Sequence, residues 1–285
     1  ITTYHPFAAN VAIMVGGVRE YGHPDRIFHP GQAYLQLRHI FVPFPVQLDC
    51  MRLARLAAPT HHRHVAISFL GSENSRIRQI FRHVAEDPNL PYMYDSRLFL
   101  RVLPDDQETA RRAALGEGGS LWQGSMKSAG DLYASSELCL LLPGHIYDFG
   151  RRAYDFMAHG CVPVVVTEAP LFISVPFAGQ LPWEDIAIFA QVQSKDEAAE
   201  LINTLLLAAS TDDGRERIAK RRQALVKHAP QLYLPPHKNC PSDSESAADG
   251  IVRELGIRQL TWASLRFMHP GREAFGASSW RRVNI

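Results

Sequence analysis

The segment 138–168, LCLLLPGHIYDFGRRAYDFMAHGCVPVVVTE, constrains the fold of this chain most strongly. Residues 138–142 are short and wholly apolar, which predicts a buried strand that ends at Pro143-Gly144, and residues 161–166 predict a second strand. Between them, one short helix is indicated by apolar and small residues at helical spacing, namely Ala153, Phe156, Met157 and Gly160. A strand, loop, helix and strand in this order form the unit of a parallel sheet, which can hold a phosphorylated ligand at the helix N-terminus.

The same helix carries Arg152, Asp155 and His159 along another face. A guanidinium near the first turn can bind a diphosphate with two hydrogen bonds, and a carboxylate one turn later can accept hydrogen bonds from ribose hydroxyls. This arrangement favours a nucleotide-sugar site. The alternative is an exposed arginine–acid pair on a helix surface, which contributes only about a few tenths of a kcal/mol to stability.

Other segments repeat the alternation of strands and helices. Strands are predicted at 65–70, 96–102 and 185–192. Ser75 is a candidate N-cap for a helix to about residue 84, with Arg76 in the first turn of a second candidate anion site, and Ser194 opens an S-x-x-E capping box for a helix to about residue 209. A basic helix should follow over 211–228, and we expect its cations to form a charged outer face. The pattern predicts an α/β fold with a doubly wound parallel sheet and helices on both faces.

The composition limits the classes of function. The 285 residues are 46% hydrophobic and 21% charged, with a formal net charge of +1, which is ordinary for a globular protein and implies no general attraction to nucleic acid or to an anionic membrane. No apolar run approaches the roughly 18 residues that cross a bilayer. The chain begins at Ile1 rather than Met, so we expect a piece of a longer or processed protein.

Metal and redox sites have little support in the sequence. The acidic pairs Asp105-Asp106 and Asp212-Asp213 lie in polar stretches and do not form the D-x-D triplet that holds a divalent cation on a diphosphate. The histidines of the tract 61–64 have no nearby acid, and we expect solvated side chains there. We therefore expect no metal and no other cofactor.

The four cysteines are Cys50, Cys139, Cys161 and Cys240. None forms a C-x-x-C pair, which argues against a zinc site. Cys139 and Cys161 head adjacent apolar strands and are most simply interpreted as small buried hydrophobic residues. A disulfide in an oxidising compartment is the alternative, and the three ways of pairing four cysteines stay open.

Several motifs together resemble the exostosin-type glycosyltransferases, also called glycosyltransferase family 47. The family pattern is followed at SSELCLLLPG, at GRRAYDFMAHGCVPVVVTE and at the later VPF and LPWEDIAIF. Upstream, FHPGQ at 28–32, IFVPFP at 40–45 and VAISFLGS at 65–72 resemble further family segments in the correct order. The resemblance covers about residues 25–210. It departs from the family where Asp155 replaces glutamate, where Glu137-Leu138 replaces an aromatic residue, and where residues 171–175 carry a short insertion.

The resemblance implies a set of nucleotide-sugar-binding residues, which are Arg76, Ser136, Gly144, Arg152, Asp155, Thr167 and Glu168. It also implies the two-domain GT-B arrangement with the N-terminal domain largely missing. We expect residues 1–60 to be the end of the acceptor-side domain and a linker, 61–230 the Rossmann-like donor domain, and 231–285 a C-terminal loop, short helix and tail.

The implied reaction is the metal-independent and inverting transfer of a sugar from a nucleotide diphosphate, UDP first, to a polysaccharide or glycoprotein glycan. Such a transfer needs a base for the acceptor hydroxyl, and His5, Asp25 and His29 are the titratable candidates without a motif behind them. Family resemblance places the protein on the lumenal side of the Golgi membrane, with its anchor outside this segment. The alternative function is an inactive exostosin-like domain that serves glycan binding or assembly, which the shorter acid at Asp155 favours.

Overall fold

The structure is a computed structural model. It describes residues 12–15, 39–42, 48–92, 95–103, 128–144, 151–167, 175–177, 180–233, 238–241 and 244–253.

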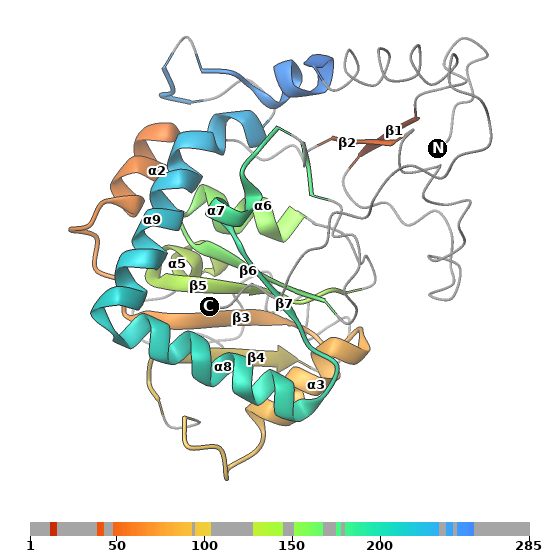
Figure 1. Ribbon diagram of the computed structural model, residues 1–285, viewed down its shortest axis with the longest axis vertical. Helices are drawn as coiled ribbons and strands as arrows, with labels where there is room; N and C mark the ends of the chain where they lie inside the picture. The colour runs from red at the N-terminus through yellow and green to blue at the C-terminus, as the bar shows by residue number, and fades with distance from the viewer. Residues whose placement is uncertain are drawn as a thin grey trace.

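A five-stranded parallel sheet forms the centre of the described part (Figure 1). Its spatial order is β4-β3-β5-β6-β7, and every neighbouring pair is parallel. The strands are β3 (Val65–Ser72), β4 (Leu98–Leu103), β5 (Ser136–Leu141), β6 (Val162–Thr167) and β7 (Ile188–Gln191). The prediction of an α/β fold with a parallel sheet is confirmed. Upstream, β1 (Ala12–Val15) pairs in parallel with β2 (His39–Val42) in a separate two-stranded sheet.

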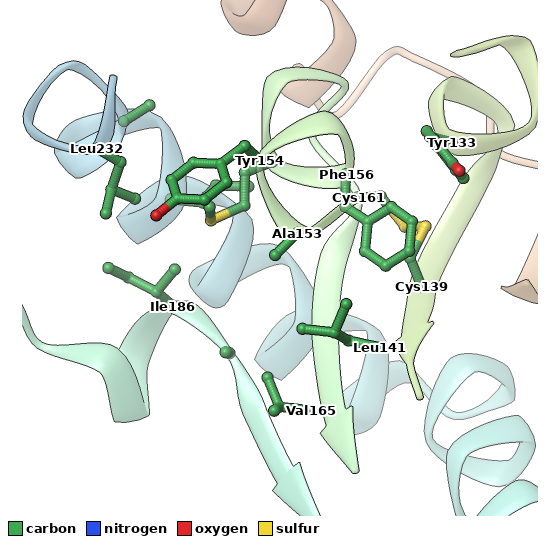
Figure 2. Packing of buried hydrophobic residues seen from close by; sticks show 14 of the residues in the cluster. Tyr133, Cys139, Leu141, Ala153, Tyr154, Phe156, Cys161, Val165, Ile186 and Leu232 are labelled. Carbon is green, nitrogen blue, oxygen red and sulfur yellow. A yellow bond between two sulfur atoms is a disulfide. The ribbon is translucent and has the colours of Figure 1, made fainter. Parts of the chain in front are cut away.

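The three central strands, β3, β5 and β6, are apolar on both sides and are mostly buried, while the edge strands β4 and β7 are partly exposed. In β5, Leu138 and Leu140 face one hydrophobic cluster while Cys139 and Leu141 face the other. The first cluster contains side chains of α3 (Arg76–Ala85) and α8 (Lys195–Ser210). The second cluster contains side chains of α2 (Cys50–Ala57), α5 (Ala129–Ser135), α6 (Arg151–Ala158) and α7 (Trp183–Ile186), and Figure 2 shows part of its packing. Helices on both faces make the sheet doubly wound, as predicted.

The two predicted helix N-caps, Ser75 and Ser194, are confirmed, whereas the predicted capping box at Ser194 is only half formed. Ser75 caps α3, and its Oγ accepts a hydrogen bond from the Arg78 amide. Ser194 caps α8 by accepting a hydrogen bond from the amide of Glu197 at 3.2 Å. The Glu197 carboxylate accepts from the Gln193 amide at 2.6 Å, one residue before the Ser194 amide that a capping box would engage. The predicted strand at 185–192 begins only at Ile188, because residues 183–186 form α7 around the buried Trp183.

The basic helix α9 (Asp212–His228) is present as predicted. Its exposed side chains are paired along the helix, with Arg217 3.1 Å from Asp213 and Lys220 2.7 Å from Glu216. The expectation that the cations of this helix form an outer charged face is wrong for Arg222, which is only 8% exposed. Arg222 donates a hydrogen bond to the Gly160 carbonyl at 2.9 Å and forms an ion pair with Glu137. After α9 come η3 (Ala229–Leu232) and a helical stretch at 247–253.

The structure contains two disulfides, one of which corrects the interpretation of Cys139 and Cys161 as small hydrophobic residues with free thiols. Cys139 of β5 is bonded to Cys161, which precedes β6, and both are fully buried (Figure 2). Cys50 at the start of α2 is bonded to Cys240, across 190 residues of sequence. A short parallel bridge between Asp49 and Lys238 lies beside the second bond. The two bonds select one of the three pairings that the sequence left open.

A buried arginine holds the amino end of the sheet together. Arg63 donates hydrogen bonds to the carbonyls of Leu56, Tyr133, Ser136 and His159 at 2.6–3.0 Å. Leu56 and Tyr133 lie in the last turns of α2 and α5, and His159 follows the end of α6. Three helix C-termini, where carbonyls lack intrahelical partners, therefore share one guanidinium. Burial lowers the pKa of Arg63 to about 9, which leaves it charged at neutral pH.

The histidine tract beside Arg63 is only partly solvated. His62 and His64 are exposed as expected, whereas His61 is half-buried and its Nε2 lies 3.0 Å from the carbonyl oxygen of Ala134. Among the described residues there is no cluster of three histidines, cysteines or acids that could hold a metal ion.

Segments on both sides of the expected domain boundaries contribute to the core. Leu48 and Leu53 precede residue 60 and are buried in the cluster that contains α6, as are Leu232, Tyr233 and Ala247 beyond residue 230. The division at 60 and 230 stays a prediction. No helix within the described ranges has the length and apolar character needed to span a membrane.

Candidate functional site

The strand order locates a switch point between β3 and β5. From β3 the chain continues to β4 on one side, and β5 then pairs on the opposite side of β3. The helix after β3, α3, contributes to one hydrophobic cluster, and the helix after β5, α6, contributes to the other. Ligands of open α/β sheets bind at the carboxyl ends of strands at such a point, because the two following helices diverge there. The carboxyl ends of β3 and β5 are therefore the candidate site.

Arg152, in the first turn of α6, reaches this point. Its guanidinium carbon lies 5.6 Å from the ring centroid of Phe69 in β3. Its Nη1 lies 2.8 Å from the place that a Cβ would take at Gly71, near the end of β3. The Nη1 atom is buried and has no hydrogen-bond partner among the described residues. A buried charged donor without an acceptor is costly, and an anion is one kind of group that could satisfy it. Nε of Arg63 and Nε of Arg221 are also buried without a partner among the described residues.

Arg78 is a second cation at the same point, and the sequence interpretation missed it. Its Nη1 donates to the carbonyl of Ser72 at 2.9 Å, and its Nη2 donates to that of Leu142 at 3.1 Å. Its guanidinium carbon lies 5.5 Å from the centroid of the Phe69 ring. The carbonyl bonds fix the guanidinium against the ends of β3 and β5. The available signal was an arginine among the buried positions of α3, between Ile77 and Phe81.

Gly144, in the loop after β5, lies against this arginine. A Cβ at Gly144 would be 2.8 Å from Arg78 Nη2 and 3.1 Å from Asn74 Oδ1. The Asn74 Oδ1 atom is buried and has no hydrogen-bond partner among the described residues. The Ser75 hydroxyl donates to the Pro143 carbonyl at 2.6 Å and so ties the start of α3 to the loop. A side chain at position 144 would therefore displace the Arg78 guanidinium or the Asn74 side chain.

Two predicted site residues are not brought to this point. Arg76 is exposed, and its Nη2 lies 3.5 Å from the carbonyl of Gln193, in the connection between β7 and α8. Ser136 is fully buried at the amino end of β5, where its hydroxyl donates to the Leu132 carbonyl at 2.6 Å. The five residue steps from Ser136 to Leu141 at the end of β5 span about 16 Å of strand. Ser136 therefore lies at the opposite end of the sheet, among the four residues whose carbonyls accept hydrogen bonds from Arg63, which are Leu56, Tyr133, Ser136 and His159. We call these residues and Arg63 the Arg63 cluster.

Asp155 lies one turn after Arg152 on α6 and is half-buried. Two buried tyrosines, Tyr133 and Tyr233, have raised pKa values. Burial is the main cause, and the negative charge of Asp155 raises both pKa values further. The backbone carbonyl of Asp155 lies 2.7 Å from Nδ1 of His159, which closes the last turn of the helix. Burial, together with the charges of Arg52 and Arg63, lowers the pKa of His159. The helix thus runs from the candidate site at Arg152 to the Arg63 cluster at His159.

Thr167 ends β6 at the same edge of the sheet, and its carbonyl accepts a hydrogen bond from the Val192 amide at 2.8 Å. Glu168 lies outside the described residues, as do the candidate bases His5, Asp25 and His29 and the pair Asp105-Asp106. Asp212 and Asp213 are in the first turn of α9 and form ion pairs with Arg215 and Arg217.

Comparison with known proteins identifies the family. Residues 24–205 match the model of the exostosin GT47 domain, a glycosyltransferase family. A rice protein (Oryza sativa subsp. japonica) named as a probable glucuronosyltransferase is 30% identical over 105 residues, which cover 36% of this chain and 23% of the rice protein. Among solved structures, sucrose-phosphate synthase from Thermosynechococcus elongatus aligns with 82% of this chain and 57% of its own chain, at 16% identity and a TM-score of 0.38. The chain belongs to the exostosin GT47 family, as the motifs predicted.

Proposed function

We propose that this member of the exostosin GT47 family binds a nucleotide-diphosphate sugar, UDP first, at the carboxyl ends of β3 and β5. It transfers the sugar to a polysaccharide or glycoprotein glycan with inversion and without a metal ion. The observation that carries the proposal is the Nη1 of Arg152 at the switch point of the sheet, which is buried and has no partner in the part of the chain that the structure describes.

The diphosphate is the part of the donor that this geometry suits. Arg78 and Arg152 come from helices that pack in the two different hydrophobic clusters, and their guanidiniums meet at the Phe69 ring. Arg152 can donate to phosphate oxygens, and Arg78, which is held by the carbonyls of Ser72 and Leu142, adds a fixed positive charge. The first turn of α6 adds the positive end of its helix dipole. Two fixed guanidiniums supply positive charge that a divalent cation would otherwise bring, which is the basis for proposing metal-independent transfer.

The chemical step places its charge where these residues lie. The bond between the sugar anomeric carbon and the β-phosphate oxygen breaks, and its electron pair stays on the nucleoside diphosphate. The acceptor oxygen forms the new bond on the opposite face of the sugar and gives its proton to a base. Positive groups already fixed around the leaving diphosphate stabilise this charge as it develops. In this proposal, Asp155 accepts hydrogen bonds from the ribose hydroxyls.

The compartment follows from the cysteines and the family. Two disulfides among four cysteines suit an oxidising compartment. Together with the family, they support the lumenal side of the Golgi membrane as the location. The name of the rice relative makes UDP-glucuronate the first donor sugar to test.

The direct test is calorimetric titration of UDP into the full chain and its variants. Arg152→Lys should weaken binding by tenfold or more, because a point charge cannot replace the two-pronged contact. Arg152→Ala should weaken it further. Arg55→Ala removes an exposed arginine of α2 and is the matched control, with affinity unchanged. Unchanged affinity in Arg152→Ala would refute the assignment.

Metal dependence and activity are tested separately. UDP binding should survive EDTA, and loss on chelation with recovery in Mn²⁺ would show that an acidic pair is a ligand. A screen for hydrolysis and transfer of UDP-sugars then separates an enzyme from the alternative, an inactive exostosin-like domain that binds glycans or assembles with a partner. UDP binding without turnover in the full-length protein would favour that alternative.

A further inference from the structure

We infer that Phe69 is a positioning residue for the candidate donor site: its ring holds Arg78 and Arg152 together before a ligand arrives. This inference rests on the proposed function, because it explains how that site keeps two cations at one place. Phe69 itself touches no ligand in the proposal.

The guanidiniums of Arg78 and Arg152 both lie next to the ring of Phe69. The guanidinium carbon of Arg78 lies 5.5 Å from the ring centroid of Phe69, and that of Arg152 lies 5.6 Å from it. Both distances are within the range of cation–π attraction, about 6 Å. Arg78 comes from α3 and Arg152 from α6, so the ring joins the two helices that diverge at the switch point.

Burial makes the attraction effective. Phe69 is 1% exposed, so water screens the ring weakly. No ion pair to an acid is formed by Arg152 within the described part of the chain, and its Nη1 has no hydrogen bond there. The negative face of an aromatic ring can hold such a cation without neutralising it. An acid in the same place would occupy the guanidinium and compete with a diphosphate, whereas the ring leaves the N–H groups available.

Gly71 provides the space for this arrangement. Two residues apart on a strand, Phe69 and Gly71 point to the same side of the sheet. A Cβ at Gly71 would lie 2.8 Å from Cζ of Phe69 and 2.8 Å from Nη1 of Arg152. Both atoms occupy space that any other side chain would fill, so the glycine lets the guanidinium reach the ring.

The test replaces Phe69 with phenylalanines that carry one, two or three ring fluorines. Fluorine withdraws electron density from the ring face with little change in ring shape, so it weakens the cation–π attraction while the packing is nearly kept. We expect the affinity for UDP to fall stepwise with each fluorine, by about three- to tenfold at the trifluoro ring. The same series at Phe81 is the control, since this buried residue of the same hydrophobic cluster has neither guanidinium on its ring.

The outcomes separate this inference from the proposed function. If Arg152→Ala loses UDP binding but the fluorinated Phe69 series keeps or gains affinity, the positioning role of Phe69 is refuted and the donor site stands. If UDP binds none of the proteins, the donor proposal fails, and the positioning role of Phe69 is then tested by NMR without a ligand. The Nε–Hε NMR signals of Arg78 and Arg152 should then carry ring-current shifts that vanish in Phe69→Leu, while the Arg55 signal does not move. Absence of those shifts in the unmodified protein would overturn the inference.

Discussion

Two arginines at opposite ends of one sheet differ in the number of backbone carbonyls around them. Arg63 is buried and Arg152 is half-buried, and each has one buried nitrogen without a partner among the described residues, Nε of Arg63 and Nη1 of Arg152. Arg63 at the amino end donates to four backbone carbonyls. Arg152 at the carboxyl end has a buried Nη1 with no acceptor among the described residues. The first arginine satisfies helix C-termini, and the second stands beside a helix N-terminus, where no carbonyl is left over.

The difference shows how a structural cation is told from a functional one. A guanidinium that donates to backbone carbonyls, as those of Arg63 and Arg78 do, stabilises the fold, and its removal leaves those carbonyls without a donor. A guanidinium that packs on an aromatic ring and has one buried N–H group without an acceptor, as Arg152 does among the described residues, destabilises the free protein. A bound anion can offset this destabilisation by accepting the hydrogen bond. Removing each arginine should therefore affect different measurements.

The largest expected effect is the loss of stability in Arg63→Met. Four carbonyls lose their donor in a buried place, so we expect the free energy of unfolding to fall by about 3–5 kcal/mol. Urea denaturation measures it, with Arg55→Met as a surface control that should change stability by no more than about 0.5 kcal/mol. A fall below about 1 kcal/mol would mean that water replaces Arg63 at these carbonyls and that the comparison is mistaken.

The next largest effect is the loss of UDP affinity in Asp155→Asn, which removes the proposed contact with the ribose. The charge-assisted hydrogen bonds of a carboxylate to the 2′- and 3′-hydroxyls contribute about 1.5–3 kcal/mol, so UDP should bind about tenfold more weakly or worse. Asp155→Glu, which restores the family residue, should keep or improve binding. Calorimetry with UDP and with 2′,3′-dideoxy-UDP checks the contact. Equal affinity of the unmodified protein for both ligands would mean that Asp155 does not bind the ribose.

A smaller effect sharpens the contrast at the carboxyl end. Arg152→Met removes a buried nitrogen that has no partner among the residues described, so the free energy of unfolding should change by less than about 1 kcal/mol, in either direction, while UDP binding is lost. Thermal unfolding with and without UDP measures both quantities in one experiment. A destabilisation as large as that of Arg63→Met would make Arg152 a structural residue as well.

The smallest effect is the pH dependence contributed by His159. Its pKa lies below the ordinary 6.5, chiefly through burial, so below about pH 6.5 the unfolded chain binds more protons than the folded one. Its contribution to stability is therefore present above pH 6.5 and is lost as the pH falls toward the folded pKa. Unfolding at pH 7.5 and pH 5.5 should show a smaller difference in His159→Gln than in the unmodified chain. An equal difference in both would mean that His159 does not titrate in this way.

The sequence by itself determined the elements that rest on local pattern. Apolar runs located the strands of the sheet, and Ser75 and Ser194 located the starts of two helices, because capping and burial act over a few neighbouring residues. The motif around Cys139 and Cys161 identified the family. Gly144 and Arg152 lie near the carboxyl end of β5 because the loop and the helix that hold them follow that strand, and their part in donor binding stays a prediction.

Only the tertiary structure decided which residues meet across these elements. Arg63 reaches the Ser136 carbonyl across 73 positions, and Arg78 reaches the Leu142 carbonyl across 64, distances that no local period encodes. Periodicity shows which face of an element is buried, but it does not show which element ends lie together or which donors have acceptors. That is why Ser136 was expected at the donor site and lies at the other end of the sheet. It is also why the shared ring of Phe69 is visible only in the fold, since strand order brings α3 and α6 to one strand end.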